Sequence, residues 1–170
     1  MIRLSAFADE IAPDLDQQLA VLEEEGIHYL DLRAVWDTNV MDLSDRQVAE
    51  IQRALERAGV GVAAIGSPVG KVSIDVPFEE QLQKLERAVA LAQAFRTPFI
   101  RVFSFYPPAS GQAPAYRDQV LARLRAMTDR ARASGVTLLH ENDTGLYGET
   151  VERCLDVLQG VDDPHLQAVL

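Results

Sequence analysis

A glutamate at the end of a short apolar run is the residue of this sequence best placed to do chemistry. The run at 136–139 predicts a buried strand, Glu141 stands at its carboxyl end, and a loop begins at Asn142. Burying a carboxylate costs free energy unless something binds it. In parallel α/β proteins the carboxyl ends of the strands are where ligands bind. Glu141 is therefore a candidate ligand or acid–base group, provided that the chain forms a parallel sheet.

The predicted strands and helices alternate strictly along the chain. Strands are predicted at residues 2–7, 27–33, 60–65, 99–105, 136–141 and from 167 onward. A helical pattern follows each of the first five, and Ser44 with Gln47 predicts a capping box at the start of the second helix. Parallel strands need crossover connections, so this alternation predicts one domain with a parallel sheet and right-handed crossovers.

Two architectures fit this alternation, a doubly wound open sheet and a (β/α)8 barrel. Polar residues fall on one parity within the predicted strands, as Asp31, Arg33 and Arg101 do. A barrel strand packs one face on helices and lines the interior with the other, whereas a doubly wound strand is apolar on both faces. No G-x-G-x-x-G fingerprint follows the first predicted strand. We therefore expect a parallel (β/α) barrel of TIM type.

The length of 170 residues is short for that fold. A complete barrel needs about 250 residues, and only five βα units and the start of a sixth strand are predicted here. We expect a single partial TIM-barrel domain over residues 1–170, which is either truncated or completed by another copy in a homo-oligomer. Its first and sixth strands would otherwise be open sheet edges, which favour aggregation.

Composition and charge restrict the partners that this chain can have. A net charge of -10 and a pI of about 4.7 argue against a nucleic-acid backbone or an anionic membrane as partner. We find no apolar run of bilayer length and no signal peptide. The one cysteine, Cys154, allows no intrachain disulfide. We therefore expect a cytoplasmic protein with a small-molecule partner.

Several short motifs stand at the predicted strand ends and loops in an order typical of one superfamily. They are ADEIAPDLDQQL at 8–19, LDLR at 30–33, AAIGSPVGK at 63–71, IRVFSFY at 100–106, and LLHENDTGLYG at 138–148 with GETVERCLDVL behind it. In this spacing the chain resembles the sugar phosphate isomerases and epimerases of the xylose-isomerase-like TIM-barrel superfamily. The resemblance runs over about residues 7–170.

The resemblance implies a metal-dependent isomerisation or epimerisation beside a carbonyl. In that superfamily a Glu on a middle strand holds a divalent metal together with an Asp, a His and a second Glu from later strands. Glu141 matches the first Glu, as metal ligand and as one member of the catalytic pair that moves a proton through an enediolate. The other three would lie beyond Leu170, so we expect an incomplete, inactive site. Mn²⁺, Mg²⁺, Co²⁺ and Zn²⁺ all suit this ligation.

Other side chains near the predicted mouth could contact a sugar or sugar-like substrate. Lys71 ends a glycine-bracketed loop and could bind an oxyanion or phosphate, or be a solvated loop lysine. Arg33 and Arg101 could bind substrate, although an interior salt bridge is the stronger prediction for at least one of them. Trp36 could pack on a sugar face or belong to the helix-packing core, and Tyr147 is a similar candidate.

Three alternatives remain open at this point. A dehydratase of the inosose type is a near neighbour, because it also begins by removing a proton beside a carbonyl. The endonuclease branch of the superfamily fits less well, since it needs more histidines and a basic face for DNA. The chain could also be a non-catalytic partial barrel that self-associates. His140, beside Glu141, occupies a position usually aliphatic in the superfamily, and strand parity predicts that it points away from the interior.

Overall fold

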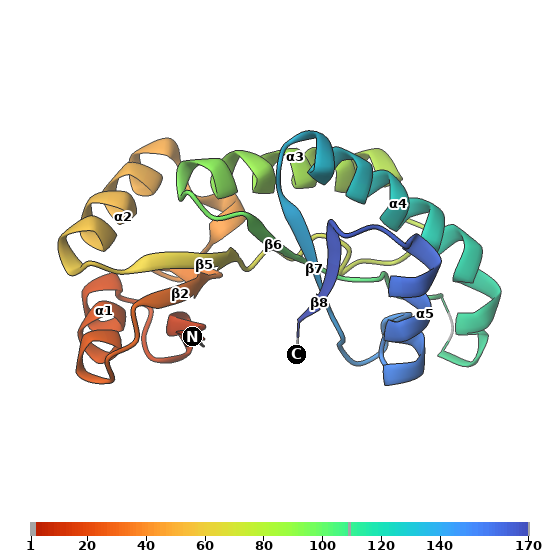
Figure 1. The fold of residues 1–170 in the computed structure, drawn as a ribbon, viewed down its shortest axis with the longest axis horizontal. Coiled ribbons are helices and arrows are strands. Elements are labelled where there is room, and N and C mark those ends of the chain that lie inside the picture. Colours follow the sequence, from red (N-terminus) through yellow and green to blue (C-terminus); the bar gives the residue numbers. More distant parts are fainter. Residues whose placement is uncertain (1–2, 109, 170) are drawn as a thin grey trace. The chain divides into compact units, whose positions relative to one another are not determined.

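The computed structural model describes residues 3–108 and 110–169 and confirms the alternation of strands and helices (Figure 1). The strands of the parallel sheet are β1 (Ser5–Ala6), β2 (Tyr29–Leu32), β5 (Gly61–Ile65), β6 (Phe99–Val102), β7 (Thr137–Glu141) and β8 (Leu166–Val169). The helices between them are α1 (Leu15–Glu24), α2 (Asp45–Ala58), α3 (Phe78–Ala94), α4 (Arg117–Ala133) and α5 (Val151–Val161). This order is that of a partial (β/α) barrel of TIM type.

The chain divides into two compact units. Residues 1–67 with 90–98 form the N-terminal unit, and residues 68–89 with 99–170 form the C-terminal unit. In the N-terminal unit β1 pairs with β2 and β2 with β5, all parallel, with a register shift in β2 after Leu30. In the C-terminal unit β6 pairs with β7 and β7 with β8, also parallel. In that register His140 lies between Val102 and Ala168.

A hairpin follows β2 that the sequence pattern did not predict. Its strands are β3 (Ala34–Val35) and β4 (Thr38–Asn39), which pair antiparallel. The two turn residues, Trp36 and Asp37, both have a φ of 55°. A turn with two positive φ angles matches the twist of a two-residue hairpin, but it usually carries Asn or Gly. Trp36 and Asp37 are neither Asn nor Gly, so the sequence gives no indication of a hairpin turn here.

Local hydrogen bonds explain where several helices begin. The capping box of α2 is confirmed, because Ser44 and Gln47 bond reciprocally through side chain and backbone. Asp14 caps α1 and Thr150 caps α5 with a single hydrogen bond each, in which the side chain accepts a backbone N–H of the first turn. Short 3₁₀ helices η1 (Ala8–Glu10), η2 (Val40–Asp42) and η3 (Ser110–Tyr116) lie outside the predicted elements.

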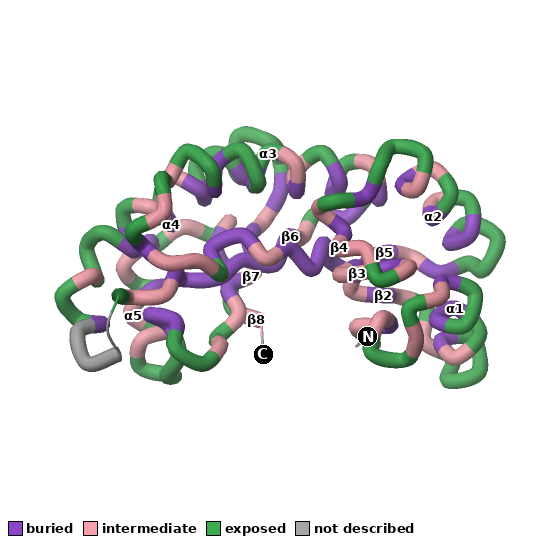
Figure 2. The backbone as a smooth tube through the Cα atoms, turned by 180° about the vertical axis from the view of Figure 1, so that it is seen from behind, coloured by how far each residue is buried: buried purple, intermediate pink, exposed green. Residues whose placement is uncertain are grey.

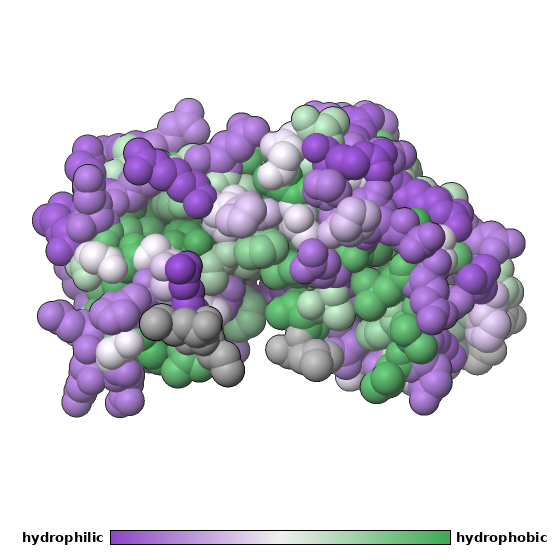
Figure 3. Space-filling model, in the orientation of Figure 1, coloured by the Kyte–Doolittle hydropathy of each residue, from purple (hydrophilic) through white to green (hydrophobic). Residues whose placement is uncertain are grey.

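The apolar core of each unit lies on its strands and on the inner faces of its helices. Figure 2 shows buried residues concentrated in β5, β6 and β7, whereas the helices alternate between buried and exposed residues. The helix α5 differs, since Val151 is 79% exposed and Leu155 is 52% exposed. Apolar surface is visible over this helix in Figure 3. None of the helices in the described ranges combines the length and apolar character that crossing a bilayer requires.

Candidate functional site

Glu141 is the last residue of β7, and its carboxylate lies beside the guanidinium of Arg101 on β6. Arg101 Nη1 is 3.4 Å from Glu141 Oε2 and 3.5 Å from Oε1. Arg101 is 8% exposed, and about a quarter of the Glu141 side chain stays accessible. The pair is thus a loose ion pair, open on the carboxylate side, at the carboxyl end of two parallel strands. Catalytic groups of barrel enzymes lie at this end of the strands.

A second ion pair, between Lys71 and Asp143, lies in the same unit. The Lys71 ammonium contacts the Asp143 carboxylate, and this hydrogen bond lowers the pKa of Asp143 below its ordinary value. The Arg101 charge adds a smaller effect in the same direction. Because both carboxylates are matched by cations, the four side chains form an electrically balanced set.

The ring of Phe103 connects the two ion pairs. Lys71 Nζ is 5.0 Å and Arg101 Cζ is 4.9 Å from its centroid, within the range of cation–π attraction. Phe103 is 1% exposed, so the ring is a fixed platform for the two cations. Sequence reasoning missed both Phe103 and Asp143. The signal for Phe103 was its place in the alternating pattern of IRVFSFY. The signal for Asp143 was a second carboxylate two residues after Glu141.

Backbone hydrogen bonds tie together the loops that carry these side chains. The N–H of Phe103 donates to Val69 O and that of Phe105 to Gly70 O, each at 2.8 Å. Phe105 O accepts the N–H of Tyr147 at 2.9 Å. Phe105 is fully buried with a φ of 65°, which is unusual for a bulky residue. The predicted strand over 99–105 therefore ends at Val102, because the chain turns to join the loops after β5 and β7.

The N-terminal unit places Arg33, another candidate, in an acidic environment. Arg33 Nε donates to Asp9 Oδ2 at 2.7 Å and Nη2 donates to Glu10 Oε1 at 3.0 Å. Burial lowers the pKa of Arg33, but the hydrogen bonds to both carboxylates outweigh it and leave this pKa raised. The guanidinium also lies 4.7 Å from the Phe7 ring centroid. Arg33 and Arg101 thus both form ion pairs within the protein, which the sequence predicted for at least one of them.

Trp36 forms the tip of the β3–β4 hairpin and is half-buried. Its backbone N–H donates to Pro13 O at 2.6 Å, and its backbone carbonyl accepts the Thr38 hydroxyl at 3.2 Å. A tryptophan in the left-handed region is strained, and such strain persists only where the surroundings hold it. The contact of Trp36 with a sugar face stays a prediction.

Tyr147 lies in the loop after β7 and is 3% exposed. Its hydroxyl donates to Asp156 Oδ2 at 2.7 Å, and Asp156 is also paired with Arg117. Burial and this hydrogen bond raise the pKa of Tyr147 to about 12. The hydroxyl therefore holds the loop on α5, and its predicted contact with substrate stays a prediction.

His140 points to the opposite face of β7 from Glu141 and is 1% exposed. Neither of its ring nitrogens has a hydrogen-bond partner among the described residues. Burial lowers its pKa to about 4, so the imidazole is neutral near pH 7. The ring packs against Gly148, where a β-carbon would lie 2.5 Å from His140 Cε1. His140 is thus a packing residue on the helix-facing side of the strand.

The described residues do not by themselves fit a divalent metal ion. No three His, Cys, Asp or Glu side chains are grouped as ligands within residues 3–108 and 110–169. Glu141 is beside a guanidinium, and Asp143 is bonded to an ammonium group. Mg²⁺ and Mn²⁺ need several oxygen ligands, and one carboxylate does not provide them.

Comparison with known proteins identifies the family. A family model described as xylose isomerase-like TIM barrel matches residues 19–170. The chain belongs to the xylose isomerase-like TIM barrel family. No curated protein matches this family member in sequence.

Solved structures similar to this family member share its fold. A xylose isomerase-like TIM barrel protein from Mycobacterium smegmatis in complex with magnesium has 21% identity and a TM-score of 0.73, over 98% of this chain and 63% of that one. A probable 3-DHS dehydratase from Bacillus anthracis, AsbF, has 19% identity and a TM-score of 0.78, over 98% and 62%. The zinc-binding IOLI protein has 14% identity and a TM-score of 0.78, over 99% and 62%.

These similarities concern the fold and not the reaction, because the identities are low. The family member described here spans about 62–63% of the length of these three structures. Of the residues predicted from the sequence, Glu141, Arg101 and Lys71 lie together in the C-terminal unit, around Phe103. Arg33 and Trp36 belong to the N-terminal unit.

Proposed function

We propose that this chain is part of an isomerase or epimerase that acts on a sugar or a sugar-like polyol or ketose. Glu141 is the proposed catalytic residue, and Lys71, Arg101, Arg33, Trp36 and Tyr147 are the proposed substrate contacts. The observation that carries the proposal is the open carboxylate of Glu141 at the carboxyl end of β7, beside the buried Arg101. In a member of this family, that position is where ligands and reacting groups are expected.

The proposed chemistry is proton transfer at a carbon next to a carbonyl group. The Glu141 carboxylate takes the proton from that carbon, the electron pair moves into the carbonyl, and an enediolate forms. Returning the proton to the neighbouring carbon, while the hydroxyl proton passes to the former carbonyl oxygen, isomerises the substrate. Returning it to the opposite face of the original carbon epimerises the substrate. The cations of Arg101 and Lys71 would favour the negative charge that develops on oxygen.

Membership of the family is the reason to include a divalent metal, Mn²⁺, Mg²⁺, Co²⁺ or Zn²⁺, in the proposed function. One of the similar structures is a complex with magnesium, and another contains zinc. The described residues offer such an ion the carboxylate of Glu141, and further ligands would have to come from other sequence. We therefore assign no step of the reaction to the metal.

The test is exchange of a substrate proton with solvent deuterium, followed by proton NMR on a panel of ketoses and inososes. The chain is assayed alone and in a version completed with the remaining strands of the barrel, each with Mn²⁺ present. We expect exchange by the completed version alone, and Glu141→Gln lowers its rate at least about 100-fold, as loss of an acid–base group does. Loss of water from the substrate would identify a dehydratase instead.

Glu149→Gln is the matched control for this test. Glu149 is exposed and lies in the loop after the same strand. We expect the control to exchange the substrate proton at the unaltered rate. Equal exchange by Glu141→Gln and Glu149→Gln would contradict the assignment of Glu141.

A second candidate function is a non-catalytic partial barrel that self-associates. Within the described residues β1 pairs only with β2, and β8 pairs only with β7. Leu4, beside β1, is 68% exposed. Open parallel edges and exposed apolar side chains favour pairing with another chain. Sedimentation equilibrium tests this, since a monomer at micromolar concentration would reject self-association and a dimer would support it.

A further inference from the structure

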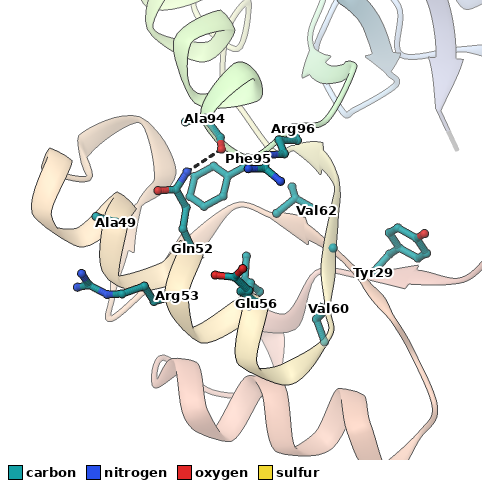
Figure 4. Close-up of a pocket in the computed structure, with 12 residues that line it drawn as sticks. Tyr29, Ala49, Gln52, Arg53, Glu56, Val60, Val62, Ala94, Phe95 and Arg96 are labelled. Carbon is teal, nitrogen blue, oxygen red and sulfur yellow. Dashed lines mark hydrogen bonds between the residues drawn. The ribbon is translucent and has the colours of Figure 1, made fainter.

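A pocket of about 590 Å³ lies within the N-terminal unit, and none of the residues that line it is proposed above as catalytic or substrate-binding (Figure 4). It is formed by α2, by the amino ends of β2 and β5, and by residues 94–96 at the end of α3. Arg33 follows the carboxyl end of β2, at the other end of that strand. A pocket at the amino end therefore differs from the substrate site expected at the mouth of a barrel.

The inner wall of the pocket is apolar. Leu55, Val60, Val62 and Phe95 line it, and they are 5–8% exposed. A volume of this size lies within the range of about 300–1000 Å³ that small-molecule sites occupy. The wall thus suits the apolar body of a small ligand.

Two arginines, Arg53 and Arg96, line the same pocket. Among the described residues neither guanidinium has a hydrogen bond or an ion pair. By contrast, Arg33, Arg117 and Arg130 each contact a carboxylate. Figure 4 shows the Arg53 side chain directed away from Phe95 and Val62, whereas the Arg96 side chain lies beside Phe95. Arg96 is therefore the cation that suits an anionic group on a ligand in this pocket.

The backbone at Arg96 is held in an unusual conformation. Its φ is 56°, and it is the second residue after the end of α3, a position where glycine is usual. Arginine in this region costs about 1 kcal/mol relative to glycine. Figure 4 shows the Arg96 side chain beside Phe95. Strain of this kind, kept at a pocket, points to a function for the side chain.

A hydrogen bond between two elements keeps the pocket in shape. Gln52 Nε2 on α2 donates to Ala94 O, the last residue of α3, at 2.6 Å (Figure 4). The Thr97 hydroxyl, just beyond the pocket, donates to Ala63 O on β5 at 2.5 Å. The walls are thus joined to one another before any ligand binds, which lowers the entropic cost of binding.

We propose that this pocket binds a small anion with an apolar body, such as an arylalkyl carboxylate, with Arg96 holding the acidic group. Glu56 also lines the pocket and carries the opposite charge. Its carboxylate repels an anion, so replacing it by a neutral side chain should strengthen binding of the anion, whereas loss of Arg96 should weaken it. The proposal is independent of the proposed isomerase function.

The test measures binding of 4-phenylbutyrate to the 170-residue chain by titration calorimetry. The neutral 4-phenyl-1-butanol, which has the same apolar body, is the matched ligand. The variants are Arg96→Asn, since Asn tolerates a positive φ, and Glu56→Gln on α2. Arg57→Gln is the control, because Arg57 is exposed on the same helix and does not line the pocket. Circular dichroism confirms that each variant is folded.

We expect Arg96→Asn to weaken binding of the acid about tenfold, the size of a lost charge-assisted hydrogen bond. Arg57→Gln leaves the affinity unchanged, and Glu56→Gln strengthens binding several-fold. The alcohol binds about tenfold more weakly than the acid and is insensitive to Arg96→Asn. Three results would overturn the proposal: no saturable binding of the acid, equal affinity for the alcohol, or an equal loss in Arg57→Gln.

Discussion

A β-carbon on Gly70 would lie 2.1 Å from the carbonyl oxygen of Phe103, closer than any two such atoms can approach. Gly70 has a φ of 83°, and its N–H donates to Gln81 Oε1 at 3.1 Å. The loop before Lys71 thus packs backbone against backbone on the segment after β6. This close approach places the Lys71 ammonium over the Phe103 ring.

Replacing Gly70 by alanine should destabilise the protein more than the same change at Gly135. Gly135 has a similar φ of 71°, but nothing lies within 4 Å of the position that a β-carbon would take there. Gly135→Ala therefore costs only the left-handed conformation, about 1 kcal/mol, whereas Gly70→Ala adds a steric overlap and costs about 3 kcal/mol. Urea denaturation measures both free energies of unfolding. Equal losses would show that the loop moves away from Phe103 without cost.

His140 should make the protein lose stability in acid. Its pKa in the folded protein is about 4, below the ordinary 6.5, so the unfolded chain binds the extra proton first as pH falls. The free energy of unfolding then decreases between pH 6.5 and about 4, by roughly 1.4 kcal/mol per pH unit at most. His140→Leu should flatten this part of the curve, measured by urea denaturation at several pH values. His28→Gln, at an exposed site, should leave the slope unchanged.

Removing Lys71 should raise the pKa of Asp143. The hydrogen bond and charge of Lys71 hold this pKa down, although partial burial opposes them. In Lys71→Met we expect the Asp143 carboxyl to titrate nearer its ordinary value, followed by carbon-13 NMR. Lys84 is the other lysine of the chain, and Lys84→Met should leave the Asp143 titration unaltered. An unshifted Asp143 in Lys71→Met would mean that this ion pair does not form in solution.

Tyr147→Phe should lower stability by about 1–2 kcal/mol, because it leaves the hydrogen bond to Asp156 unmade. The raised pKa of Tyr147, about 12, means that the folded protein keeps a proton that the unfolded chain releases. Stability therefore falls as pH rises from about 10 to 12, and Tyr147→Phe removes this dependence. Absorbance at alkaline pH measures the titration. Tyr116→Phe is the control, since the Tyr116 hydroxyl has no hydrogen bond among the described residues.

Much of the fold follows from local sequence signals. Apolar periodicity located the strands and helices, and Ser44 with Gln47 marked the start of α2. The hairpin around Trp36 and Asp37 escaped prediction, because neither residue is a usual choice for positive φ. The predicted fourth strand was too long, since the bonds that end β6 at Val102 come from a loop some thirty residues earlier.

By itself the sequence determined that Glu141 ends a strand and that Arg101 shares the polar parity of its neighbours. Strand periodicity is a local property, and such positions can therefore be predicted. Only the tertiary structure decided which charges meet: Lys71 pairs with Asp143, Arg101 lies beside Glu141, and Phe103 carries both cations. Ion pairs depend on distances of a few ångströms between loops remote in sequence. Here those distances are set by the approach of Gly70 to Phe103, which no local pattern encodes.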